Sequence, residues 1–77
     1  MLVEYNSAKR AIVTAIVNEN ARSSMMLALS LKIHPAIVEH VLNELEHKGY
    51  VIAAYHNQGI SVRPKPTLPR LLRDLEQ

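Results

Sequence analysis

The chain has 77 residues, of which 48% are hydrophobic and 21% charged, and its formal net charge is +2. A chain of this length can bury one hydrophobic core but not two, so a multidomain protein is excluded. The absence of cysteine excludes disulfides and thiolate zinc sites, and the charge balance excludes a strongly basic arm.

No segment of the sequence is apolar over the length of a membrane span. The longest unbroken apolar stretches are Met25–Leu29 and Tyr50–Tyr55, far short of the roughly 20 residues that a span requires. The first residues lack the basic region and apolar run of a secretion signal. We therefore expect a cytoplasmic protein with no membrane contact.

The N-terminal segment predicts an amphipathic helix. Asn6 or Ser7 can cap its start, and the polar residues 18–20 are a suitable end. The apolar positions are Ala8, Ala11, Ile12, Ala15 and Ile16. Because they recur three and four residues apart, they form one stripe that faces a core.

Two further helices are predicted, with a short break between them. Ser23 or Ser24 can cap the first, which runs to Leu31 before residues 32–34 break it. Pro35 suits the first turn of the next helix, because the missing N–H of proline has no partner there in any case. The apolar positions of that helix are Val38, Val41, Leu42 and Leu45.

A β-hairpin is predicted after Gly49, which is a typical left-handed end of a helix. From there the apolar period changes from about 3.6 to 2 residues. Residues 50–55 are predicted as a strand, 56–59 as a turn and 60–63 as the returning strand. The prolines that follow should end the hairpin, since proline cannot donate to a β-ladder.

A leucine stripe marks the C-terminal segment, where Thr67 can cap a short helix. Its members are Leu68, Leu71, Leu72 and Leu75. So short a helix is unstable alone, so the stripe either folds back on the first helix or forms a homodimer interface. We therefore divide the chain into a domain at residues 1–66 and a packing or dimerisation segment at residues 67–77.

The order of three helices and a hairpin resembles the winged helix-turn-helix of transcription regulators. Between residues 23 and 63, the matching positions are Leu27, Ala28, Leu31, Ile33, Val38, Leu42, Leu45, Gly49, Val51 and Ile52. The resemblance implies an α+β fold that is mostly α, with a hairpin wing after three helices and, in this chain, a short C-terminal helix. Small Ala28 would let two helices cross closely, and Ile33 would fill the turn between them.

The sequence departs from this family pattern at the turn and in the third helix. Lys32 stands where the family usually carries glycine, and residues 34–36 read His-Pro-Ala where Ser or Thr with a basic neighbour is common. Residues 39–49 contain three glutamates and one lysine, which gives them a net charge of −2. The resemblance is therefore more specific for the fold than for the target.

The function that the resemblance implies is sequence-specific binding of double-stranded DNA, with the third helix in the major groove and the wing on the DNA backbone. The exposed positions that would read bases are Ala36, Glu39, His40 and Asn43. Asn can contact adenine, Glu can accept from cytosine N4, and His can donate to guanine N7. The cations that would contact phosphates are Lys9, Arg10, Arg22, Lys32, Arg63 and Lys65.

The charge of the third helix supports an alternative, a protein–protein interaction module on the same scaffold. Residues 1–38 and 50–77 each carry a net charge of +2, so a positive rim surrounds an acidic helix. Phosphate contacts need cations near the reading helix. An acidic helix would instead meet a basic partner or face water, with Glu44 and Lys48 paired one turn apart.

The sequence contains no motif of a metal centre or an enzyme. His40 and His47 are seven residues apart, about 10 Å along a helix, so one ion cannot bind both. With only two glycines, the chain has no glycine-rich phosphate loop, and it has no supported Ser–His–Asp arrangement. We therefore expect no metal, no cofactor and no enzymatic activity.

Overall fold

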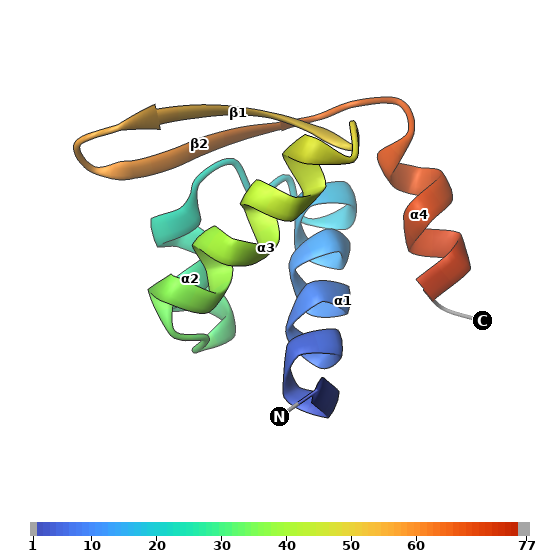
Figure 1. The fold of residues 1–77 in the computed structure, drawn as a ribbon, viewed down its shortest axis with the longest axis horizontal. Helices are drawn as coiled ribbons and strands as arrows, with labels where there is room; N and C mark the ends of the chain where they lie inside the picture. Colours follow the sequence, from blue (N-terminus) through green and yellow to red (C-terminus); the bar gives the residue numbers. More distant parts are fainter. Residues whose placement is uncertain (1, 76–77) are drawn as a thin grey trace.

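The computed structural model describes residues 2–75, and this part of the chain forms four α-helices and one two-stranded antiparallel hairpin (Figure 1). The elements are α1 (Leu2–Asn18), α2 (Ser24–Leu31), α3 (Pro35–His47), β1 (Val51–His56), β2 (Gly59–Pro64) and α4 (Leu68–Leu75). The predicted class, a mostly helical α+β fold, is confirmed. Within residues 2–75, no helix has the length and apolar character needed to cross a membrane.

Helix α1 begins earlier than the sequence predicts. We expected its start at Asn6 or Ser7, but the helix already runs from Leu2. Both of those polar side chains are exposed, so they fit inside the helix at little cost, and packing overrides their preference for a cap. The additional turn contains Tyr5, which packs against the core and meets the ring of His40 edge-on at 5.5 Å between centroids.

Helix α2 is capped by Ser23, as predicted. The Ser23 backbone is extended, and its hydroxyl accepts a hydrogen bond of 3.0 Å from the N–H of Met26. At the other end Lys32 has a φ of +56° and takes the left-handed conformation that the expected glycine would take. That conformation costs a non-glycine residue about 1 kcal/mol, so the tight turn into α3 carries some strain.

Helix α3 starts at Pro35, as predicted, and turns its apolar side into the core. The Nδ1 atom of His34 caps the helix by accepting a 3.0 Å hydrogen bond from the N–H of Ala36. The completely buried side chains are Val38, Val41, Leu42 and Leu45. Gly49 follows with a φ of +81°, which confirms its predicted role at the helix end.

The hairpin has a tighter turn than predicted, because the strands pair up to His56 and Gly59 and leave residues 57–58 as the loop. Gly59 has a φ of +123°, and a Cβ atom there would lie 2.6 Å from the hydroxyl of Ser24. That buried hydroxyl accepts a 3.0 Å hydrogen bond from the N–H of Ile60. The first residue of α2 therefore holds the hairpin turn in place.

The connector between α1 and α2 is hydrogen-bonded to the edge of β2 that does not pair with β1. Ser23 forms an isolated antiparallel bridge with Ser61, and the N–H of Val62 donates to the carbonyl oxygen of Arg22 at 2.8 Å. Strand β2 thus lies between β1 and this connector, and its inward side chains Ile60 and Val62 are buried.

Helix α4 packs on α1 of the same chain (Figure 1). Leu68 and Leu72 are buried in the same core as the residues of α1 and α3, and Leu71 and Leu75 are partly buried against it. Of the two interpretations of the leucine stripe, the fold-back on α1 is the one that the structure shows. Leu68 and Leu72 are buried in the core of their own chain. Pairing of two copies through this segment stays a prediction.

The segment that precedes α4 is hydrogen-bonded to the segment between α3 and β1. The hydroxyl of Thr67 donates a 2.8 Å hydrogen bond to the carbonyl oxygen of Gly49. The N–H of Lys65 donates to the carbonyl oxygen of Tyr50 at 2.9 Å. Residues from the 2–66 range and from the described part of 67–77 share one hydrophobic core.

Candidate functional site

One side of α3 faces solvent beside the hairpin. Its exposed residues include all four predicted reading positions, Ala36, Glu39, His40 and Asn43. They face outward because the buried positions of the same helix recur three and four residues apart on the opposite side. Together with Tyr55 and Ile60 they line one open hollow of about 440 Å³, which we call the α3 face.

Tyr55 belongs to the α3 face, although sequence reasoning missed it. Its hydroxyl lies 3.1 Å from Asn43 Oδ1 and 3.0 Å from Glu46 Oε1, and these two acceptors share its one proton, while 57% of the residue stays exposed. Partial desolvation and the hydrogen bond to the Glu46 carboxylate raise the pKa of Tyr55 above its ordinary value. Strand alternation was the available signal, since Tyr55 lies on the same side of β1 as buried Val51.

Glu44 does not belong to the α3 face but to the contact between α1 and α3. Its carboxylate accepts hydrogen bonds from the hydroxyl of Tyr5, from Lys9 Nζ at 2.9 Å and from Lys48 Nζ at 3.1 Å. The bond from Tyr5, followed by the one from Lys9, lowers the pKa of Glu44 to about 2. The predicted pair of Glu44 and Lys48 is confirmed, and Lys9 is a second cation that compensates the same charge.

The acidic charge of α3 is therefore distributed unevenly around the helix. Glu44 is neutralised in the helix contact, and the Glu46 carboxylate holds the Tyr55 hydroxyl. Glu39 is exposed and forms no ion pair with any residue that the structure describes. Only part of the net charge of residues 39–49 is presented on the α3 face.

Two of the six predicted phosphate-contacting cations are engaged elsewhere. Lys9 is paired with Glu44, and only 16% of its side chain is exposed. The Arg22 guanidinium donates to the carbonyl oxygens of Ile16 at 3.3 Å and Ala21 at 2.9 Å, which satisfies main-chain acceptors at the end of α1. Part of the donor capacity of Lys9 and Arg22 is thus used within the chain, and their contact with phosphates stays a prediction.

The other four cations divide between two regions. Arg63 is exposed on the outward side of β2, opposite Ile52, and partly buried Lys65 follows the strand. Arg10 on α1 and Lys32 at the turn after α2 are also exposed. Among the described residues, none of these four forms an ion pair.

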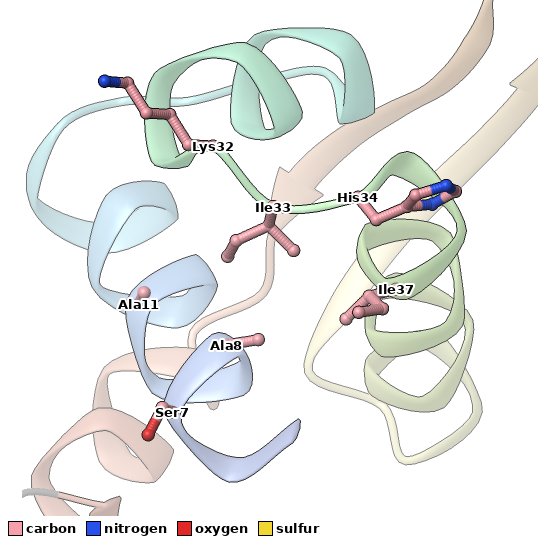
Figure 2. A pocket seen from close by; sticks show the side chains of 7 residues that line it. All are labelled: Ser7, Ala8, Ala11, Lys32, Ile33, His34 and Ile37. Atoms are coloured by element: carbon pink, nitrogen blue, oxygen red, sulfur yellow. The ribbon is translucent and has the colours of Figure 1, made fainter. Parts of the chain in front are cut away.

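A second hollow, of about 410 Å³, lies between α1 and the turn that joins α2 to α3 (Figure 2). Figure 2 shows Ala8, Ile33 and Ile37 around it, whereas the Lys32 and His34 side chains point away. Binding sites for small molecules combine apolar walls with a few polar groups that fix orientation. Ser7 also lines this hollow, so its wall is mostly apolar with little polar surface to fix the orientation of a ligand.

A third hollow lies between α2 and the hairpin loop. Met25 and Leu29 line it together with Pro35, Glu39, the loop residues 57–58 and Gly59. Leu29 is 75% exposed and Met25 56%, which is unusual for large apolar side chains. Glu39 lines both this hollow and the α3 face, so the two adjoin at that residue.

Comparison of the chain with protein-family models, with curated proteins and with solved structures gives no match. Within the described part of the chain, no group of three or more His, Asp or Glu side chains could hold a metal ion. The functional argument therefore rests on the α3 face, the hairpin and the charges around them.

Proposed function

We propose that this chain is a winged helix-turn-helix domain that binds double-stranded DNA sequence-specifically and regulates transcription. Helices α2 and α3 would form the helix-turn-helix, the hairpin would be the wing, and α3 would enter the major groove. The observation that carries this proposal is the α3 face, where all four predicted reading positions are exposed together beside the hairpin.

The placement of charge supports the proposal. An acidic reading helix would repel phosphates, but Glu44 is compensated by Lys9 and Lys48 in the contact with α1. Glu39 remains on the α3 face, where a carboxylate can accept a hydrogen bond from cytosine N4. Arg63 and Lys65 of the wing are available for the DNA backbone.

Selection from random duplexes at two salt concentrations tests the proposal. We expect enrichment of one motif and an affinity that falls steeply with salt. Asn43→Ala should change the preferred base at one position, whereas Asn18→Ala, at the exposed end of α1, should leave the motif unchanged. If no duplex binds even at low salt, the proposal is wrong.

The hollow beside α2 favours a second candidate, a protein-interaction module. Exposed Met25 and Leu29 lie next to Glu39, and no Lys or Arg lines the hollow. A peptide with an apolar side chain and a neighbouring cation would match it. Selection from a random peptide library should yield such peptides, with binding lost in Leu29→Ser and kept in Leu71→Ser. Peptides that bind Leu29→Ser equally well would exclude this candidate.

A further inference from the structure

We infer that Tyr55 fixes the side-chain amide of Asn43 and thereby determines which base Asn43 reads; this inference rests on the proposed DNA binding. Tyr55 comes from β1 and Asn43 from α3, and the hydroxyl of the first donates to Oδ1 of the second at 3.1 Å. Tyr55 would act as a specificity-determining residue through Asn43, which is the residue proposed to contact the base.

The tyrosine hydroxyl is held in place by a second acceptor. Glu46 lies three residues after Asn43 on α3, so the two side chains are neighbours on the helix surface. Its Oε1 atom accepts from the same hydroxyl at 3.0 Å. Because the hydroxyl has one proton, Glu46 and Asn43 share it, and the two acceptors together hold the Tyr55 hydroxyl beside α3.

The contact engages the amide oxygen of Asn43, which is the half that adenine recognition needs. An asparagine reads adenine by accepting from N6 through Oδ1 while donating to N7 through Nδ2. In this structure the Tyr55 hydroxyl occupies one lone pair of Oδ1, whereas Nδ2, which can only donate, forms no hydrogen bond with the described residues. The major-groove edge of guanine presents the acceptors N7 and O6 and no donor. We therefore expect the intact domain to prefer guanine opposite Asn43.

Removing the Tyr55 hydroxyl should change this preference. The test is duplex selection with the wild type, Tyr55→Phe and Asn43→Ala. The base pair whose preference disappears in Asn43→Ala is defined as the Asn43 position of the motif. In Tyr55→Phe we expect the ratio of adenine to guanine at that position to rise at least about fivefold, the lower end of the discrimination by a bidentate contact.

Tyr50→Phe is the matched control. Tyr50 directly precedes β1 and packs against the core, and its hydroxyl forms no hydrogen bond with the residues that the structure describes. This variant loses the same atom and should keep the wild-type motif.

The free protein gives a readout that does not depend on DNA. Nitrogen relaxation of the Asn43 side-chain amide should show greater mobility in Tyr55→Phe than in the wild type or in Tyr50→Phe. Equal mobility in all three overturns the inference.

The selections separate the inference from the function on which it rests. A wild type that binds no duplex overturns the proposed function, and the inference with it. A wild type that selects a motif with adenine at the Asn43 position, or a Tyr55→Phe variant that selects the wild-type base there, overturns the inference alone.

Discussion

Lys9 of α1 and Glu44 of α3 form an ion pair of 2.9 Å across a sequence separation of 35 residues. The hydroxyl of Tyr5 and the ammonium of Lys48 bind the same carboxylate. This group fixes how α1 lies against α3, and it removes one negative charge from the surface proposed to meet DNA. Both consequences can be measured.

Acid should destabilise the fold through Glu44. Its pKa lies at about 2 in the folded chain, against an ordinary value of 4.5. Because the unfolded chain then binds the proton more readily, this stabilisation is complete above pH 4.5 and is lost as the pH falls toward 2. We expect a loss on the order of 2 kcal/mol in the free energy of unfolding.

Urea unfolding across this pH range measures the effect. Glu44→Gln should flatten the pH dependence and should cost on the order of 2 kcal/mol at neutral pH. Glu39→Gln removes an exposed carboxylate that forms no ion pair with the described residues, and it should keep the wild-type curve. A Glu44→Gln curve as steep as that of the wild type would assign the effect to other groups.

Salt dependence should identify the wing cations. Each phosphate contact contributes about 0.9 to the slope of log affinity against log salt. The double variant Arg63→Ala, Lys65→Ala should therefore lower the slope by up to about 1.8. Arg70→Ala with Arg73→Ala changes the net charge equally at exposed positions of α4 and should leave the slope nearly unchanged. Equal slopes in the two double variants would contradict the wing contact.

Gly59→Ala should be more harmful than Gly49→Ala. Both glycines have a positive φ, but a Cβ atom at Gly59 would collide with the Ser24 hydroxyl, whereas at Gly49 no atom lies within 4 Å. We expect losses of about 3 and about 1 kcal/mol respectively in the free energy of unfolding. Similar losses would mean that the close approach to Ser24 contributes nothing.

Truncation of Leu68 should show that α4 belongs to the core. The side chain is completely buried, and Leu71 on the same helix is only partly so. Leu68→Ala should cost about 3 kcal/mol, and Leu71→Ala less than half of that. Thermal and urea unfolding give both values, and a single transition in each variant is expected for a shared core.

Dimerisation through the leucine segment is tested by sedimentation. If Leu71 and Leu75, which keep part of their surface exposed, join two copies, Leu71→Asp with Leu75→Asp should give a monomer. Leu68→Ala is the control, because it weakens the packing of α4 in the core but leaves Leu71 and Leu75 in place. This variant should sediment like the wild type. A wild type that sediments as a monomer at high concentration would exclude the homodimer.

The order of the elements was predictable because its signals are local. The cap at Ser23, Pro35 in a first helical turn and Gly49 at a helix end each depend on a few neighbouring residues, and the structure has all three. The start of α1 was not predictable in this way. Asn6 and Ser7 can serve as a cap or as exposed helix positions, and contacts with distant α3 decide between the two.

The candidate site was predictable only where helix periodicity defines it. Periodicity identified the exposed positions of α3, but it could not show that Lys9 is paired with Glu44. It also could not bring Tyr55 to Asn43, because that contact depends on how the hairpin lies against α3. Spacing along one helix therefore identifies an exposed face, whereas the packing of distant segments determines which of its groups are free.

The buried hydroxyl of Ser24, which accepts from the N–H of Ile60, has a consequence for association. It holds the hairpin on α2 before any partner arrives, so the loop and α3 form one preorganised surface. A partner that touches both then loses little conformational entropy in the protein on binding. We therefore expect fast, single-step association that is limited by encounter and electrostatic steering rather than by ordering of the hairpin.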